Sequence, residues 1–278
     1  MQSFTCLLLV AVVARGQEPS GSTAEDASNT KPATDVERAE ETVLRARAEA
    51  EHYRIVRDDD PQAKVELREK PILKWSNPSE GALFGSVVLW TVDGRPEAVA
   101  SIYRWYTAKR EFHAEFKSLS THPLSTTRGK EPAWATGESD VKFHVLAHGS
   151  PPADREGRRA QQMRDIARRF AADLVHPSKG RNVLRLLPQP VYRYEKLPRE
   201  LLDGALFAFV QGTDPEVFLL IEAEKTDGGA RWRYAASRMN MFELHLSLDD
   251  KEVWNAPEMT WNDVADRRGP YTIIVLDY

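Results

Sequence analysis

Aromatic residues form the clearest set of side chains that could bind a ligand. Tyr103 and Trp105 lie two residues apart in a predicted strand, so their rings project from the same face of the sheet. A row of rings on a sheet face can stack on a sugar or on another flat ligand. We therefore take Trp75, Tyr103, Trp105 and Trp134 as candidate binding residues. Core packing is the alternative, and the sequence favours it because aromatic residues are common in strands and dominate cores.

A second candidate surface is a run of arginines in a predicted helix over residues 154–175. Arg164 and Arg168 lie one turn apart there, and arginine binds phosphate and carboxylate through two parallel hydrogen bonds. The same face holds Arg155, Arg158, Arg159 and Arg169, together with Asp154, Glu156 and Asp165. These charges predict either a site for a polyanion or an ordinary solvated helix face, and the acidic residues favour the solvated face.

The sequence contains none of the common catalytic motifs. It holds no Gly-x-Ser-x-Gly, no His-Glu-x-x-His, no Gly-rich phosphate loop and no dinucleotide-binding fingerprint. His144 and His148 have the spacing of a helical metal pair, but the alternating sequence around them predicts a strand. In a strand the two rings would lie about 13 Å apart, too far to share a metal ion. We therefore predict no cofactor and no metal site, and catalytic residues are unknown.

The acidic residues do not indicate a site by themselves. Pairs such as Glu222 and Glu224 could act in glycoside hydrolysis, but the chain has 42 acidic residues and such pairs arise by chance. The segment 212–216, Gly-Thr-Asp-Pro-Glu, is either an acidic site or a hairpin turn. Its glycine, aspartate and proline favour the turn.

The start of the chain predicts export. Residues 4–14 form an apolar run that ends in Ala14-Arg15-Gly16, a small-x-small cleavage pattern, ahead of polar residues. We predict a signal peptide over 1–16 and a flexible leader over 17–33, with the mature protein periplasmic or extracellular in a bacterium. No Lys or Arg precedes the run, and a short buried helix is the alternative. Cys6, the single cysteine, lies within the run, so the mature chain would have no disulfide.

Length and charge exclude several classes of protein. The chain has 278 residues, of which 41% are hydrophobic, enough for one large domain or two small ones with a core. Its formal net charge of -4 provides no overall field for nucleic acid, so no nucleic-acid partner is expected. Charges interrupt every apolar segment after residue 16, and no membrane span is predicted there.

The elements that would position these residues follow from hydrophobic periodicity. Thr34 and Glu37 have capping-box spacing, and apolar residues at steps of three and four predict an N-terminal helix within 34–60 that packs on a sheet or on another helix. A first β half spans 61–150, where Asp93-Gly94 turns one strand into the next. Residues 151–182 contain a linker and the arginine-rich helix, and a second β half spans 183–278.

The two β halves share sequence features in the same order. Gly-Ala-Leu-Phe follows Glu80 in the first half and Asp203 in the second, and Pro-Glu opens the next strand at Pro96 and at Pro215. These matched positions lie 123 and 119 residues apart, which an internal duplication or a chance similarity would explain. We predict an α+β fold with two related antiparallel β-meanders, an N-terminal helix and a long helix between the repeats.

Three segments carry a resemblance to known proteins. Leu-Pro-Gln-Pro-Val-Tyr-Arg-Tyr at 187–194, and Asp-Gly-Ala-Leu-Phe-Ala-Phe-Val at 203–210 followed by the segment 212–216, resemble a family of exported bacterial proteins of uncharacterised activity. The similarity covers most of the mature chain, including 75–78. It implies export, and it assigns neither an activity nor a functional residue.

Three functions are consistent with the sequence. The first is an exported noncatalytic protein, structural or ligand-binding, with a glycan as one class of ligand. The second is a hydrolase of envelope or environmental polymers, built from carboxylates that no motif reveals. The third is a module that binds polyanions through the arginine-rich helix. A pocket with buried opposing carboxylates would favour the hydrolase, and a groove lined by rings would favour binding.

Overall fold

The computed structural model describes residues 33–106 and 111–276. The predicted signal peptide and residues 17–32 of the predicted leader lie outside the described residues. From Thr34 onward the chain forms one compact unit. Within the described ranges, no helix is both long enough and apolar enough to cross a membrane.

The protein is mostly β, which corrects the predicted α+β class. Its described residues form eighteen strands and three α-helices, α1 (Asp35–Ala50), α2 (Glu156–Ala167) and α3 (Trp261–Ala265). The predicted long helix over 154–175 is wrong beyond Ala167, because Phe170–His176 is a strand, β10. Phe170, Ala172 and Leu174 are buried in alternation, and β10 pairs with two other strands. Sheet pairing thus overrides the helical spacing of the same residues.

The first large sheet has the strand order β18-β6-β5-β4-β2, with β3 also paired to β4. Its strands are β2 (Glu66–Leu67), β3 (Leu73–Ser76), β4 (Leu83–Val92), β5 (Arg95–Trp105), β6 (Phe112–Ser118) and β18 (Tyr271–Leu276). A short 3-10 helix, η1 (Pro78–Glu80), precedes β4. Strands β4, β5 and β6 form an antiparallel meander, as the first β half predicts.

The second large sheet has the order β17-β16-β10-β11-β13-β14-β15-β9, with β12 also paired to β13. Its strands are β9 (His144–Val145), β10, β11 (Gly180–Leu186), β12 (Tyr192–Arg193), β13 (Leu201–Gln211), β14 (Asp214–Thr226), β15 (Gly229–Arg238), β16 (Glu243–Leu248) and β17 (Lys251–Ala256). A third, small sheet contains β1 (Tyr53–Arg57), β7 (Leu124–Arg128) and β8 (Glu131–Ala135).

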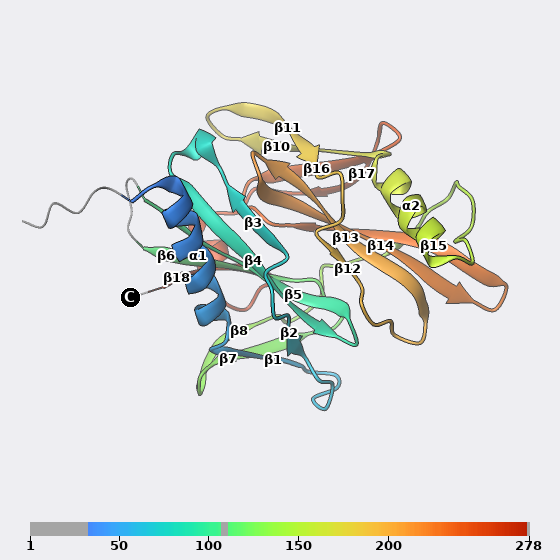
Figure 1. Ribbon diagram of the computed structural model, residues 1–278, viewed down its shortest axis with the longest axis horizontal. Helices are drawn as coiled ribbons and strands as arrows, with labels where there is room; N and C mark the ends of the chain where they lie inside the picture. Colours follow the sequence, from blue (N-terminus) through green and yellow to red (C-terminus); the bar gives the residue numbers. More distant parts are fainter. Residues whose placement is uncertain (1–32, 107–110, 277–278) are drawn as a thin grey trace, which may run out of the picture. The chain divides into compact units, whose positions relative to one another are not determined.

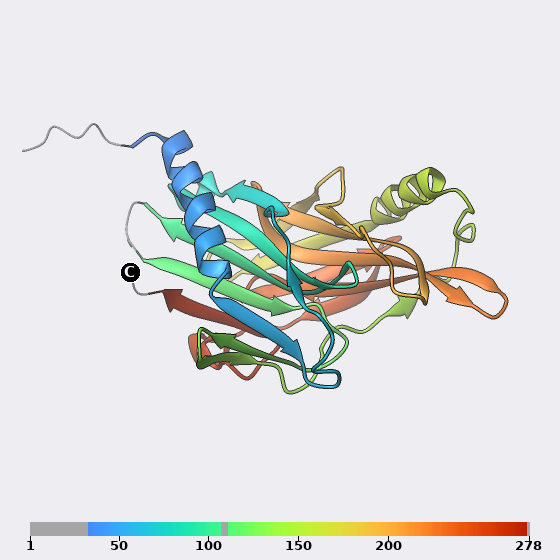
Figure 2. The same ribbon diagram turned by 60° about the horizontal axis from the view of Figure 1, so that its bottom comes forward.

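The central core lies between the two large sheets, which pack face to face. Leu89 and Val99 of the first sheet share one cluster of buried side chains with Leu206 and Phe218 of the second. On its other face the first sheet is covered by α1 and the third sheet, and the second sheet is covered by α2 (Figures 1 and 2). Both large sheets are therefore buried on two faces, and polar residues on their strands become buried as well.

Helix α1 begins where the sequence predicts and packs on the first sheet. The side chain of Thr34 accepts a hydrogen bond from the backbone of Glu37, whose carboxylate accepts one from the backbone of Thr34. Ala46 and Ala50 are fully buried, so small side chains let the helix lie close to β4 and β5 (Figure 1). The helix ends at Ala50, ten residues before the end of the predicted segment, because the chain then enters β1.

Strands β13, β14 and β15 form a second antiparallel meander, and each meander is preceded by a ring that lies over a glycine. Trp75 in β3 pairs with Gly85 in β4, and the backbone of Tyr194, just after β12, bonds to Gly204 in β13. Both the ring and the glycine recur 119 residues later. A Cβ atom would lie 2.1 Å from the Trp75 ring at Gly85 and 2.3 Å from the Tyr194 ring at Gly204. Only glycine allows either ring to keep its place.

The first turn of each meander is also built alike. Residues 93–94 join β4 to β5, and residues 212–213 join β13 to β14. A β-bulge after each turn leaves one residue without a partner in the register, Glu97 in the first meander and Glu216 in the second. A bulge redirects its side chain, and both glutamates are only 2% exposed. The two meanders thus place a buried carboxyl group at equivalent points.

Phe170→Ala is expected to lower the free energy of unfolding by about 3–5 kcal/mol, the range for a large aromatic lost from a core. The ring is buried and packs against Tyr234, with centroids 5.0 Å apart. Urea unfolding measures the change. Val183→Ala on the neighbouring strand β11 is the control, because Val183 is exposed and its loss should cost less than about 1 kcal/mol. Equal losses for both variants would show that the Phe170 site is not core.

Candidate functional site

A cavity of about 340 Å³ between the two large sheets is the candidate site. It lies near the turn 212–213, η1 and the loop that follows β15. Its walls carry aromatic rings and carboxyl groups, and we call it the aromatic–carboxyl pocket. The aromatic rings belong to Trp75, Tyr103, Trp105, Phe242, Trp261 and Tyr271, and the carboxyl groups to Glu80, Glu115, Asp214 and Glu216. Residues from both sheets contribute, so only the folded chain creates this site.

Three residues predicted from the sequence form one wall of the pocket. The ring centroid of Tyr103 lies 5.6 Å from that of Trp75 and 5.1 Å from that of Trp105. The indole Nε1 of Trp75 donates a hydrogen bond to Ser101 Oγ at 2.9 Å, which fixes the orientation of the ring. Trp75 and Tyr103 are buried, and Trp105 is half-buried. These rings therefore belong to the core and line a cavity at the same time.

Glu115 reaches the pocket from β6. It is buried, and its Oε1 accepts a hydrogen bond from the hydroxyl of Tyr271. Burial raises the pKa of Glu115 to about 8, and the hydrogen bond from Tyr271 and the positive charge of Arg238 offset only part of that rise. Glu115 is therefore mostly protonated at neutral pH.

Asp214 and Glu216 reach the pocket from the start of β14. Asn240 Nδ2 donates to Glu216 Oε2 at 2.5 Å, and Asn77 Nδ2 donates to Asp214 Oδ2 at 3.4 Å. Burial raises the pKa of Glu216 to about 8. The hydrogen bond from Asn240 lowers this pKa, and repulsion from neighbouring carboxyl groups raises it further. Burial and the charges of Glu216 and Glu115 also raise the pKa of Asp214. Asp214 is partly exposed, whereas Glu115 and Glu216 are buried.

The pocket holds an excess of acidic groups. Neither a lysine nor an arginine is among the described residues that line it. Lys179 pairs with Glu80, and Arg238 donates to the backbone carbonyls of Asn240 and Phe242. In the described part of the chain, no three His, Cys, Asp or Glu side chains are placed to hold a metal ion. The carboxyl groups are thus arranged around a space larger than a single ion.

The remaining residues predicted from the sequence lie elsewhere. Trp134 in β8 is buried on the outer side of the first sheet, with its ring centroid 5.5 Å from that of Phe116. Arg164 lies on α2 and Arg168 is its C-cap residue, and Arg168 pairs with Asp165 at 2.7 Å. The structure does not bring these three residues to the aromatic–carboxyl pocket.

The carboxyl groups are the residues of the candidate site that the sequence did not reveal. The turn predicted at 212–216 is present, but Asp214 and Glu216 also line the pocket. A signal exists in hindsight: a single acidic residue lies among apolar residues in Pro-Glu-Val-Phe at 215–218 and in Phe-His-Ala-Glu-Phe at 112–116. In a strand covered on both faces, such a residue must be buried.

Comparisons with known proteins leave the site to be argued from its own geometry. No protein-family model, no curated protein and no solved structure matches the chain. The resemblance to a family of exported bacterial proteins stays a prediction. The chemistry of the aromatic–carboxyl pocket is therefore the basis for a functional proposal.

Proposed function

We propose that the protein is an exported, noncatalytic binding protein whose aromatic–carboxyl pocket takes a small organic cation. The ligand would be an amine or quaternary ammonium with an apolar body. The main support is the pair of buried carboxyl groups, Glu115 and Glu216, in a ring-lined cavity that no described lysine or arginine lines. Aromatic faces attract cations, and a volume of about 340 Å³ suits a small ligand. Export is proposed from the apolar run at residues 4–14.

The protonation of the pocket supports a cationic ligand over a neutral or anionic one. Glu115 and Glu216 hold their protons at neutral pH because burial disfavours their charged forms. A bound cation would stabilise those charged forms and lower both pKa values. Binding near pH 7 should therefore release protons, and affinity should increase as the pH rises toward 8. An anion would find no lysine or arginine among the described residues of the lining, where His176 is the one basic side chain.

Hydrolysis is the alternative function for these carboxyl groups. A glycoside hydrolase needs one protonated acid and one ionised carboxylate on opposite sides of the bond. Here the pKa values of Glu115, Asp214 and Glu216 are all raised, and Glu80 is already paired with Lys179. Among the described residues, the pocket thus has protonated acids but no unpaired ionised carboxylate to act with them. This favours ligand binding over hydrolysis.

A polyanion site on α2 has less support. Arg159 pairs with the buried Asp203 at 3.0 Å, and Arg169 pairs with Asp249 at 2.5 Å. With Arg168 paired to Asp165, much of the positive charge of this segment is neutralised within the protein.

A quaternary ammonium and its uncharged carbon isostere provide a direct test of the proposal. Choline is expected to bind at least tenfold more tightly than dimethylbutanol, which has the same shape without the charge. In isothermal titration calorimetry at pH 7, the heat should depend on the ionisation heat of the buffer, because protons leave the pocket. Trp105→Ala should weaken choline binding about two- to thirtyfold, the range for a lost cation–π contact.

Glu216→Gln should remove part of the pH dependence of choline affinity, whereas Glu131→Gln on the exposed start of β8 should leave it unchanged. Equal affinity for choline and dimethylbutanol would contradict a cationic ligand. Binding of a monosaccharide in place of choline would favour a glycan. Turnover of a polysaccharide that Glu115→Gln abolishes would establish the hydrolase.

We also propose that the two meanders are an internal repeat that arose from one duplicated segment. The support is the constant spacing of 119 residues for three independent features: the ring, the glycine beneath it and the bulged glutamate. In this proposal, the two buried glutamates began as one residue and later acquired different surroundings.

A further inference from the structure

A second cavity, of about 550 Å³, lies at the turn 93–94 between β4 and β5. Arg95 and Glu97 of the first meander line it together with Arg233 and the segment 198–200 from the second half of the chain. We call it the charged turn pocket. It shares no lining residue with the aromatic–carboxyl pocket, so it is a separate site.

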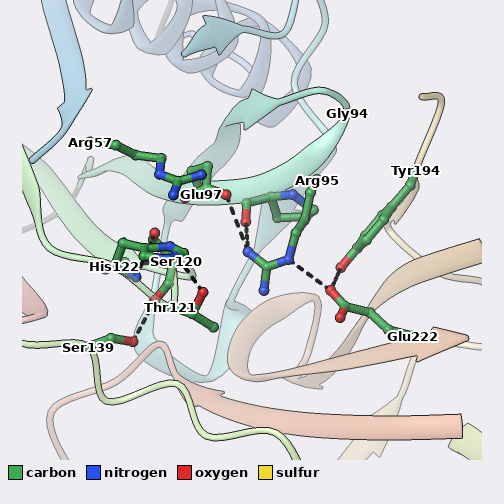
Figure 3. Close-up of polar contacts among 12 residues, drawn as sticks. Arg57, Gly94, Arg95, Glu97, Ser120, Thr121, His122, Ser139, Tyr194 and Glu222 are labelled. Atoms are coloured by element: carbon green, nitrogen blue, oxygen red, sulfur yellow. Dashed lines mark hydrogen bonds and ion pairs between the residues drawn. The ribbon is translucent and has the colours of Figure 1, made fainter. Parts of the chain in front are cut away.

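Arg95 lines this cavity and has an unused donor. The residue is 7% exposed, its Nε donates to Glu222 at 3.0 Å, and its Nη1 donates to Glu97 Oε1 at 3.3 Å (Figure 3). Its Nη2 is buried and has no hydrogen-bond partner among the described residues. Burial lowers the pKa of Arg95, but the charges of Glu222 and Glu97 outweigh that effect and the guanidinium stays charged. A buried charged donor without an acceptor is unfavourable.

Glu97 presents an unused acceptor beside that donor. The β-bulge after the turn buries its carboxylate, which pairs with Arg95 through Oε1. The other oxygen, Oε2, is buried and has no hydrogen-bond partner among the described residues. One ion pair therefore carries two unsatisfied atoms of opposite charge, Arg95 Nη2 and Glu97 Oε2.

The walls of the charged turn pocket combine an aromatic ring with further charges. The guanidinium groups of Arg95 and Arg233 lie 5.5 Å and 4.5 Å from the centre of the Phe143 ring. Thr121 and Arg199 are exposed lining residues, so they belong to the opening of the cavity. A ligand that enters would pass these two residues before it reaches Arg95 and Glu97.

We propose that the charged turn pocket binds a zwitterionic ligand of the α-amino acid type. The ligand carboxylate would accept from Arg95 Nη2, and its ammonium group would donate to Glu97 Oε2. An α-amino acid carries its carboxylate and its ammonium group on one carbon atom. The two unsatisfied atoms, Arg95 Nη2 and Glu97 Oε2, likewise belong to one ion pair, so one such ligand would provide a partner for each. The exposed lining residues Asp93, Arg199 and Glu200 carry both signs of charge and select no charge on the ligand side chain, so L-glutamate serves as one α-amino acid probe.

A ligand with a single charge would use the site less well. A simple anion would satisfy Arg95 Nη2 and leave the adjacent Glu97 Oε2 without a donor, while its charge repelled that carboxylate. A simple cation would leave Arg95 Nη2 unsatisfied and meet the positive guanidinium. Only a ligand with both charges completes the hydrogen bonds of both residues.

Titration of the full mature chain with L-glutamate, followed by calorimetry, tests the proposal. N-acetyl-L-glutamate lacks the ammonium group and γ-aminobutyrate lacks the α-carboxylate, and each is expected to bind at least tenfold more weakly than L-glutamate. Equal binding of N-acetyl-L-glutamate would overturn the proposal in favour of an anion site. Absence of L-glutamate binding at millimolar concentrations would show that the cavity holds only solvent.

Two variants locate the binding. Glu97→Gln keeps the shape of the side chain and removes its charge, so it should weaken L-glutamate binding at least tenfold. Thr121→Trp should block the opening from the surface and abolish binding, and it changes no buried residue, so it decides the question even where Glu97→Gln fails to fold. Thr226→Trp, at the exposed end of β14, is the matched control and should bind as the unmodified protein does. Unchanged affinity in Thr121→Trp would place any binding elsewhere and overturn the proposal.

Discussion

Glu222→Gln is expected to lower the free energy of unfolding by about 3–5 kcal/mol, the cost of leaving a buried charge uncompensated. Glu222 is fully buried, and its carboxylate accepts hydrogen bonds from Arg95 Nε at 3.0 Å, Tyr194 OH at 2.9 Å and Arg233 Nε at 2.9 Å. Glutamine keeps the volume but removes the charge and turns an NH₂ group toward these donors. Urea unfolding near pH 7 measures the loss.

Glu224→Gln is the matched control, because Glu224 lies two residues further along β14. It pairs with Arg231 at 2.7 Å and with Arg233 at 2.5 Å, but its side chain is partly exposed. Solvent weakens such pairs, so the expected loss is about 1 kcal/mol or less. A loss for Glu222→Gln no larger than that for Glu224→Gln would show that the buried network contributes little.

The stability of the protein is expected to fall as the pH rises from about 5 to about 8, and Glu115→Gln should remove part of that fall. The folded-state pKa of Glu115, about 8, lies above its ordinary value of 4.5. Between these two values the folded chain keeps a proton that the unfolded chain releases, so each step up in pH favours unfolding. One such buried carboxyl contributes a slope of about 1 kcal/mol per pH unit.

Glu115→Gln should therefore be close to the unmodified protein in stability near pH 5 and more stable above pH 8. Urea unfolding at several pH values gives both profiles, and Glu131→Gln, at an exposed position, should follow the unmodified protein throughout. Parallel profiles for Glu115→Gln and the unmodified protein would show that Glu115 is ionised in the folded state.

The local turns and caps could be predicted from the sequence because short-range chemistry decides them. The capping box at Thr34 and Glu37 and the hairpin at 93–94 each depend on residues within a few positions of one another. The segment 154–175 could not be predicted in the same way. Ala167, Phe170 and Leu174 fit a helical stripe, and only the pairing of β10 with β11 and β16 makes Phe170–His176 a strand.

The rings of the candidate site could be chosen in part from the sequence, but their use could not. Tyr103 and Trp105 lie two residues apart in β5, so their side chains project from the same face of the strand. Because aromatic rings can stack on a ligand, both were candidates for a binding site. The same reasoning also selected Trp134, which lies in a different part of the core. Residue type alone cannot distinguish a ring that borders a cavity from one that is packed on all sides.

By itself, the sequence determined where strands turn, where the first helix begins and which segments carry the matched Pro-Glu turns. Tertiary structure decided which polar residues are buried and what they meet. Glu97 shares its partner Arg95 with Glu222 of the other half, whereas Glu216, at the corresponding bulge, contacts Asn240 and lines a pocket with Glu115. These partners lie up to 127 residues apart in the chain, so their contacts form only when the two sheets pack and exclude water.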